Sequence, residues 1–308
     1  MLNALAIAGP TASGKSEMAY QVAEDIGGEV ISVDAGGVYR EMDIGAAKPP
    51  KQWRRRVRHH LFDIRNPNES FDAGAFCRLA VAAATDIAAR GKKPILAGGT
   101  MMYFYALHRR MHNIPPVPAA VRAQVEEEIK AKGAAAMHNA LTKADSESAQ
   151  HIQKGDSQRI CRALSVLRAS GKRLSEWQKA ARPPPLLRMQ TALFIPADRA
   201  LLRRHIGKRL RRMFADGLAE ETQAVMQKWQ LQPNAQSLRL AGYRQAADFA
   251  SGKMTEEEMH ERAYFATCQL AKRQLARLRA WQNPNIVLDP FAADARGRLL
   301  AFADNNQK

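Results

Sequence analysis

The chain has 308 residues, which is enough for about two domains with hydrophobic cores of their own. Apolar residues make up 46% of it and charged residues 25%, as in a globular protein, which excludes intrinsic disorder as its main state. Lys and Arg number 47 against 30 Asp and Glu, so the net charge is +17, which indicates a polyanionic partner.

The composition argues against a membrane protein and against a secreted one. No uninterrupted apolar run approaches the roughly 20 residues that a membrane helix needs. The amino-terminal residues carry no basic charge ahead of their apolar run, so we expect no signal peptide. Three cysteines lie far apart, and no Cys or His cluster has the spacing of metal ligands. We therefore expect a cytoplasmic protein without structural zinc.

The first third of the chain alternates between short apolar segments and amphipathic ones. Three apolar or β-branched segments predict buried parallel strands, at residues 4–8, 30–33 and 94–97. Between them, residues 16–26 and 70–90 have helical periodicity, and each pattern stops at a glycine. The inward face of the second helix is expected to carry Phe76, Leu79, Ala83 and Ile87. This alternation predicts an α/β fold with a parallel sheet flanked by helices.

The middle of the chain has a different character. From residue 113 to residue 185 the strand signals vanish, and only short helical patterns remain. Two proline-rich segments bracket this region, Pro115-Pro116-Val117-Pro118 and Pro183-Pro184-Pro185. We expect an inserted all-helical domain at 113–185 on two linkers, between a first core part at 1–112 and a second core part at 186–308.

The last third is expected to be mostly helical. Residues 191–195 and 286–288 add two candidate strands to the same sheet. Asp198 is a suitable N-cap for a helix whose apolar stripe carries Leu202, Ile206 and Leu210. Thr255 and the glutamates that follow it have the spacing of a capping box, which predicts a long helix reaching about residue 281.

A phosphate-binding motif directly follows the first predicted strand and opens the first predicted helix. The pattern G-x-x-x-x-G-K-[ST] is matched by Gly9, Pro10, Thr11, Ala12, Ser13, Gly14, Lys15 and Ser16. Backbone N–H groups of such a loop surround phosphate oxygens at the positive end of the helix. Lys15 would neutralise the terminal phosphates, and the Ser16 hydroxyl would ligate Mg²⁺. The motif predicts a bound diphosphate or triphosphate, whereas the alternative is a mere glycine-rich turn.

The acidic residue that a phosphate-loop kinase needs is missing from the expected place. The predicted strand at 94–97 ends in two glycines and Thr100, with no acid to hold magnesium. The acid that does follow a predicted strand is Asp34, at the carboxyl edge of the sheet, where open α/β sheets bind their ligands. Asp34 could assist magnesium or act as a base, and the alternative is an aspartate that only forms the turn before Gly36.

Taken together, the motifs resemble those of bacterial tRNA dimethylallyltransferases over essentially the whole chain. Besides the phosphate loop, the matching residues are Ile31-Ser32-Val33-Asp34, Tyr39, Met42-Asp43-Ile44-Gly45, Ala47-Lys48-Pro49, Asp63-Ile64, Gly98-Gly99-Thr100, Tyr103, Gly242-Tyr243-Arg244-Gln245 and Ala271-Lys272-Arg273-Gln274. The resemblance implies transfer of a dimethylallyl group from dimethylallyl diphosphate to N6 of adenosine 37 in tRNA, with Mg²⁺ as cofactor and diphosphate as product. It also implies that the phosphate loop binds the diphosphate of the prenyl donor.

The resemblance implies roles for individual residues. Asp34 would accept the proton of N6, Thr100 would lie where the active site meets tRNA, and Arg209 would meet the diphosphate. Residues implied to contact tRNA are Asp34, Ala35, Gly36, Gly37, Thr100, Arg122, Gln158, Arg159, Arg162, Gly242, Tyr243, Arg244, Gln245, Lys272 and Arg273. The helical insertion would clamp tRNA while the adenine turns out of the anticodon loop. For Arg209 and the other arginines, a solvated surface position is the alternative.

Three residues depart from the pattern of the family, and two other functions are alternatives. Ala35 and Gly37 stand where many members of the family have Ser and Gln, and Ala46 stands where Thr is common. The resemblance therefore does not define the contacts of this loop with tRNA. A small-molecule or nucleotide kinase is disfavoured by the missing acid and the net charge, and a non-catalytic RNA-binding protein by the intact Lys15 and Asp34. We expect a monomer, since no apolar interface stripe is evident.

Overall fold

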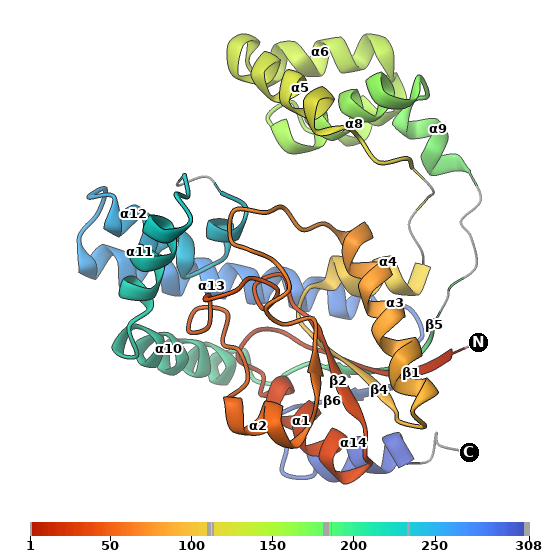
Figure 1. The fold of residues 1–308 in the computed structure, drawn as a ribbon, viewed down its shortest axis with the longest axis vertical. Coiled ribbons are helices and arrows are strands. Elements are labelled where there is room, and N and C mark those ends of the chain that lie inside the picture. The colour runs from red at the N-terminus through yellow and green to blue at the C-terminus, as the bar shows by residue number, and fades with distance from the viewer. Residues whose placement is uncertain are drawn as a thin grey trace. The chain divides into compact units, whose positions relative to one another are not determined.

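A computed structural model describes residues 2–109, 112, 114–180, 185, 187–232 and 235–304 (Figure 1). The chain divides into two compact units, one made of Met1–His108 with Leu186–Lys308 and the other of Arg109–Pro185. Pro183 and Pro184, in the second of the expected linkers, lie outside the described residues. The expected clamping of tRNA by residues 113–185 stays a prediction.

A six-stranded sheet forms the centre of the first unit, with the strand order β3-β2-β4-β1-β5-β6 and parallel pairing throughout. The strands are β1 (Leu2–Ala8), β2 (Glu29–Val33), β3 (His59–His60), β4 (Pro94–Gly98), β5 (Leu187–Phe194) and β6 (Ile286–Leu288). All five expected strands are present, and the predicted α/β fold is confirmed. Strand β3 was not predicted, because its two half-buried histidines form no apolar run.

Helices cover both faces of the sheet, so its central strands are buried on both sides (Figure 1). In β1, Leu5 and Ile7 pack with the face of the sheet that α1 (Lys15–Asp25) and α14 (Ala295–Asp304) cover. Ala4 and Ala6 point to the opposite face and join the larger core. The helices contributing to that core are α3 (Ala73–Ala89), α4 (Met101–Arg109), α10 (Arg199–Ala215), α11 (Leu218–Lys228), α12 (Tyr243–Ala250) and α13 (Glu256–Arg279).

Helix α3 differs from its prediction in two respects. It begins at Ala73, because Asp72 accepts a hydrogen bond from the backbone N–H of Ala75 at 2.7 Å and so caps the helix. Phe76 and Ile87 are buried as predicted, but Leu79 and Ala83 are only partly buried. The fully buried positions between them are Ala80 and Ala84. These two small residues allow α3 to pack closely on the sheet. The prediction placed the buried face from the larger apolar side chains and therefore missed them.

The predicted helix starts in the last third are confirmed. The Asp198 carboxylate accepts from the backbone N–H of Ala200 at 2.6 Å and caps α10, with the predicted stripe of α10 buried. At α13, the Thr255 hydroxyl accepts from the N–H of Glu258, and the Glu258 carboxylate accepts from the N–H of Thr255. Both ends of this capping box are therefore satisfied.

The second unit has a hydrophobic core of its own and only helices among its described residues. They are α5 (Ala119–Lys132), α6 (Ala134–Ala144), α7 (Ser146–His151), α8 (Ser157–Ser170) and α9 (Leu174–Lys179). Val125, Leu141 and Ile160 are completely buried in this core. The buried Asp145 carboxylate accepts hydrogen bonds from the N–H groups of Ser148 and Ser175, which ties α7 to α9. Nowhere in the described parts of the chain is a helix both long and apolar enough to span a membrane.

A buried carboxylate at the start of β2 predicts a pH-dependent stability. The Glu29 side chain is 2% exposed and bonds to Arg90, His60 and Lys92. Hydrogen bonds from Arg90 hold the pKa of Glu29 well below its ordinary value, and those from His60 and Lys92 add to this effect against the opposing effect of burial. We expect Glu29→Gln to lower the free energy of unfolding by roughly 3 kcal/mol at pH 7, because three donors lose a charged acceptor.

Urea unfolding at several pH values tests this expectation. A depressed carboxylate pKa stabilises the folded state above the ordinary value of 4.5, and this contribution is lost as the pH falls below it. The difference between wild type and Glu29→Gln should therefore shrink at acid pH. Glu41→Gln, which breaks the exposed pair with Lys228, is the matched control and should change little at any pH. A pH-independent loss for Glu29→Gln would show that its charge is not the cause.

Candidate active site

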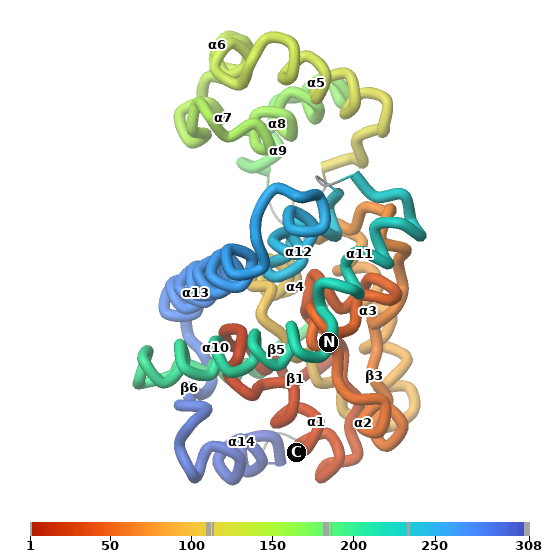
Figure 2. Tube along the Cα trace, turned by 90° about the vertical axis from the view of Figure 1, so that its left-hand side faces the viewer, coloured from red at the N-terminus to blue at the C-terminus, as the bar shows by residue number. Residues whose placement is uncertain are grey.

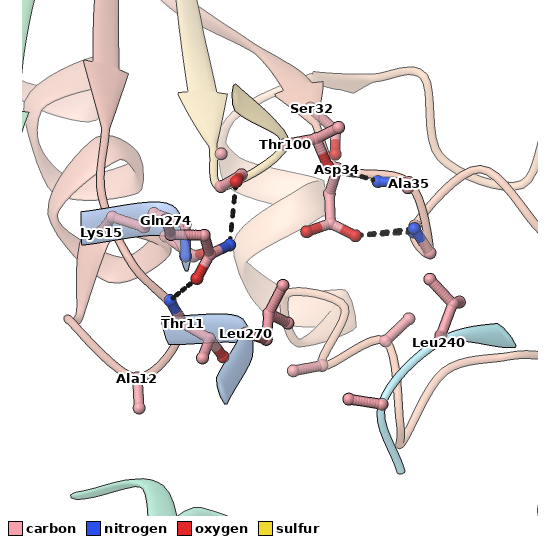
Figure 3. Close-up of a pocket in the computed structure, with 18 of the residues that line it drawn as sticks. Thr11, Ala12, Lys15, Ser32, Asp34, Ala35, Thr100, Leu240, Leu270 and Gln274 are labelled. Atoms are coloured by element: carbon pink, nitrogen blue, oxygen red, sulfur yellow. Dashed lines mark hydrogen bonds between the residues drawn. The ribbon is translucent and has the colours of Figure 1, made fainter. Parts of the chain in front are cut away.

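A cavity of about 610 Å³ opens at the carboxyl edge of the sheet, beside the ends of β1, β2 and β4 (Figure 3). Its position agrees with the rule that open α/β sheets bind ligands at this edge. Of the site residues expected from the sequence, those lining the cavity are Thr11, Ala12, Lys15, Ser16, Asp34, Ala35, Gly36, Gly37, Thr100, Arg209 and Arg273. All of these residues belong to the first unit.

The phosphate loop joins β1 to α1 and is held in shape by its own hydrogen bonds. The Ser13 hydroxyl and the Lys15 ammonium both donate to the carbonyl oxygen of Pro10, at 2.9 and 3.1 Å. Ser13 is buried, so its hydroxyl closes the loop and is not offered to a ligand. The Ser16 side chain is exposed and lines the cavity. The loop therefore presents Ser16 and the positive end of α1 to the cavity.

Two cations line this cavity, and Lys15 is buried while Arg209 is partly buried. Burial, with a smaller effect from the charge of Arg209, lowers the pKa of Lys15 to about 8, although the Asp34 carboxylate acts in the opposite direction. Burial also lowers the pKa of Arg209, again against the Asp34 carboxylate. Arg209 is thus part of the cavity wall and not a surface arginine. Two desolvated cations next to a phosphate loop favour an anionic ligand that replaces their lost hydration.

Gln274 of α13 connects the phosphate loop to the turn after β4 (Figure 3). Its side-chain oxygen accepts from the N–H of Thr11 at 2.9 Å, and its amide nitrogen donates to the carbonyl oxygen of Gly99 at 2.8 Å. A Cβ atom at Gly99 would lie 2.6 Å from that amide nitrogen, so glycine is required for this close approach. Gln274 belongs to one of the segments that carry the resemblance, but no role was predicted for it, although a glutamine among the apolar positions of a long helix indicates buried partners.

We expect Gln274→Glu to lower kcat/KM for the substrate that binds at the phosphate loop by 10- to 100-fold, or roughly 1–3 kcal/mol. A glutamate has the same shape but cannot donate to Gly99, and its charge would face a carbonyl oxygen. Gln269→Glu, an exposed substitution on the same helix, makes the same charge change and should leave kcat/KM within about twofold. Equal rates for the two variants would show that the link from Gln274 to Thr11 and Gly99 is not needed.

Asp34 follows β2 and uses one carboxylate oxygen to shape the next turn. Its Oδ1 accepts from the N–H groups of Gly36 and Gly37, at 2.8 and 3.3 Å (Figure 3). The hydroxyl of Thr100, which follows β4, accepts a hydrogen bond from the N–H of Ala35 at 3.0 Å and so helps to hold the same turn. Among the described residues, none donates a hydrogen bond to Oδ2 of Asp34. The aspartate therefore forms the turn, as one alternative held, and also has an oxygen left for a ligand.

Residues 45–47 also line the cavity, and their position is fixed by a carboxylate that the sequence analysis did not single out. Glu221 of α11 accepts from the backbone N–H groups of Asp43 and Ile44, at 2.8 and 2.9 Å. The Tyr243 hydroxyl donates to Glu221 at 2.6 Å and accepts from the N–H of Ala46. Burial and the Glu221 carboxylate raise the pKa of Tyr243 well above its ordinary value. Tyr243 is completely buried, so its side chain positions this part of the cavity wall and has no surface for tRNA.

Other residues expected to contact tRNA differ in their surroundings. Gly242 and Gln245 cap α12 through a 3.0 Å hydrogen bond, whereas Arg244 is exposed. Lys272 is exposed on α13 outside the cavity. In the second unit, exposed side chains on α5 and α8 belong to Arg122, Gln158, Arg159 and Arg162. Contact of these residues with tRNA stays a prediction.

Comparisons with known proteins agree with this geometry. A family model described as IPP transferase matches residues 37–281. A tRNA dimethylallyltransferase of Thiobacillus denitrificans is 40% identical over 300 residues, covering 97% of this chain and 95% of the relative. One of Halorhodospira halophila is 44% identical over 276 residues and covers 89% of each chain. This chain belongs to the IPP transferase family.

Solved structures support the same assignment. The crystal structure of a tRNA isopentenylpyrophosphate transferase from Bacillus halodurans has a TM-score of 0.70 and 30% identity, covering 99% of this chain and 96% of that one. A eukaryotic dimethylallyltransferase acting on tRNA has a TM-score of 0.82 at 23% identity, over all of this chain and 79% of that one, which shows a shared fold.

Proposed function

We propose that this chain transfers the dimethylallyl group of dimethylallyl diphosphate to N6 of adenosine 37 in tRNA. The names of its relatives give transfer of a dimethylallyl group to tRNA as the activity. The proposal of this donor and this acceptor atom rests on one observation. A phosphate loop, two desolvated cations and a carboxylate with an unused oxygen line the same cavity.

The donor would bind with its diphosphate at the phosphate loop. As the bond between C1 of the prenyl group and the diphosphate oxygen breaks, negative charge grows on the leaving group. Lys15 and Arg209 would stabilise that charge, since both lie in the cavity wall and are poorly hydrated. Apolar side chains that could surround the prenyl group line the same cavity, and they are Ile206, Leu210, Met213, Leu240 and Leu270.

The site also fits a magnesium ion bound together with the diphosphate. The described residues contain no cluster of three or more His, Cys, Asp or Glu that could hold a metal. Mg²⁺ does not require one, because it commonly takes one or two protein oxygens and completes its shell with phosphate oxygens and water. The exposed Ser16 hydroxyl would supply the protein oxygen. The ion would neutralise part of the charge of the diphosphate when bound.

The N6 amine of the acceptor adenosine would lie next to Asp34. Oδ2 of Asp34 would accept a hydrogen bond from the N6 amine and then its proton, while N6 forms the new bond to C1 and diphosphate departs. The bonds from Gly36 and Gly37 to Oδ1 hold the carboxylate in place for this transfer. Adenosine 37 lies in a single-stranded loop, where turning a base out of its stack costs little.

Isotope transfer tests the proposal directly. Purified protein is incubated with Mg²⁺, unmodified tRNA carrying A36 and A37, and labelled dimethylallyl diphosphate or γ-labelled ATP. We expect label in tRNA from the prenyl donor alone, and none in a control tRNA with guanosine at position 37. Transfer of the γ-phosphate would indicate a kinase, and tRNA binding without turnover would indicate a non-catalytic RNA-binding protein. Either result would overturn the proposal.

A further inference from the structure

A second, smaller hollow of about 340 Å³ adjoins the cavity at the outer edge of the sheet. Its walls are formed by Lys51, Arg54, Arg55, His59, Phe62 and Asp63. His59 and Phe62 also line the cavity, so the two spaces share a wall. Gly37 makes this wall possible, because a Cβ atom there would lie 2.9 Å from Cε1 of the Phe62 ring.

The basic side chains of the hollow come from one face of α2 (Lys51–Arg56). Helix α2 lies beside α1 (Figure 2). From its other face, Trp53 stacks on Tyr20 of α1 with ring centroids 4.9 Å apart, and Arg56 pairs with Glu24 at 2.7 Å. Lys51, Arg54 and Arg55 are three and four residues apart and therefore lie together on the face away from α1.

Charges within the hollow do not cancel. The Asp63 carboxylate already binds Lys48 at 2.5 Å and Arg54 at 3.0 Å, so its negative charge is neutralised. Lys51 and Arg55 form no ion pair with any acidic residue in the described parts of the chain. Nε of Arg54 is buried and has no hydrogen-bond partner among the same residues. A buried, unpartnered donor is costly unless an acceptor from a ligand reaches it.

The diphosphate of the prenyl donor is too far away to fill this hollow. In the sheet, β3 is three strands from β1, which carries the phosphate loop. At about 4.8 Å per strand this separation is roughly 14 Å. A nucleotide whose base enters the cavity, however, brings its own backbone phosphates to the rim of the cavity. Guanidinium groups suit such phosphates because their donors match two phosphate oxygens at once.

We propose that this hollow binds a backbone phosphate of the tRNA next to the nucleotide whose base enters the cavity. The inference rests on the proposed function and adds a binding site on the first unit to it. A phosphate held here would fix the register of the anticodon loop without reading its sequence. Phe62 and His59, shared by both spaces, would then separate the bound base from the bound phosphate.

Substitutions on α2 test the site against a matched control. Arg55→Gln and Arg56→Gln remove the same charge from neighbouring positions of one helix, but only Arg55 lines the hollow. We expect Arg55→Gln alone to raise the Kd for tRNA about fourfold, and the double variant Lys51→Gln with Arg55→Gln to raise it about tenfold. Its plot of log K against log salt, from about 50 to 200 mM, should be less steep by about 1 for the lost phosphate contact. Arg56→Gln should change the Kd by less than about twofold.

Further measurements distinguish a failure of the proposed function from a failure of the proposed phosphate site. Wild-type transfer of the dimethylallyl group is measured first, and its absence would refute the proposed function itself. Normal transfer by wild type, with the double variant binding tRNA as tightly as Arg56→Gln does, would refute the phosphate site alone. The double variant could instead show a raised KM for dimethylallyl diphosphate, or weaker inhibition by inorganic pyrophosphate, with unchanged affinity for tRNA. That result would show that the hollow binds the diphosphate and would also refute the proposed tRNA phosphate site.

Discussion

Asp34→Asn is expected to lower the rate of prenyl transfer by 10²- to 10⁴-fold while leaving the Kd for tRNA within about twofold. Asparagine keeps an Oδ1 atom that can accept from Gly36 and Gly37, so the turn after β2 should retain its shape. It cannot take the proton of N6, and so the loss should appear in kcat more than in either KM. Single-turnover rates together with tRNA binding measure the two quantities separately.

Asp34→Ala is the companion variant. It removes the acceptor of the Gly36 and Gly37 bonds as well as the base, so it should lose turnover and also some stability. If Asp34→Asn kept full activity and Asp34→Ala did not, Asp34 would act only by forming the turn. If both were fully active, the assignment of Asp34 as the base would be wrong.

Elements with local signals were predictable from the sequence. Five strands are short apolar segments, and Asp198 and Thr255 cap helices through contacts only two or three residues away. Such signals need no knowledge of the fold. Strand β3 had none, because its place at the edge of the sheet depends on backbone pairing with β2 and not on its two histidine side chains.

The residues that hold the site together were not predictable, because their partners are distant in the chain. Gln274 bonds to Thr11 across 263 positions, and Glu221 bonds to Asp43 across 178. An acidic residue in the first turn of a helix is usually explained by the helix dipole, so Glu221 gave no separate signal. Only the folded chain shows that both side chains fix loops around the cavity.

The role of Arg209 was only partly predictable from the sequence. Its helix was predicted with the correct apolar stripe, but an arginine one position before Leu210 could equally lie on a solvated surface. In the structure, Ile206, Leu210 and Met213 line the cavity together with Arg209, so the same stripe that packs the core also carries the cation. The electrostatic effect of Arg209 on Lys15 follows from this placement and not from any spacing in the sequence.

Lys15→Met should reduce kcat/KM by about 10³-fold, or roughly 4 kcal/mol. In the proposed reaction, charge on the diphosphate increases as its bond to the prenyl group breaks, so the Lys15 ammonium would stabilise the transition state more than the bound donor. The loss should therefore appear in kcat as well as in the KM for the donor. The Kd for tRNA should not change, since Lys15 is buried in the cavity.

The same variant should be at least as stable as wild type. Burial and the nearby charge of Arg209 lower the pKa of Lys15 to about 8 from 10.5, so at pH 7 its charged form costs the folded state on the order of 3 kcal/mol. Methionine fills a similar volume without that cost, although it gives up the bond to the Pro10 carbonyl. A thermal midpoint equal to or above that of wild type, with activity lost, would show that Lys15 is kept for the ligand at the expense of stability. An active Lys15→Met, or one that unfolds early, would contradict this account of the phosphate loop.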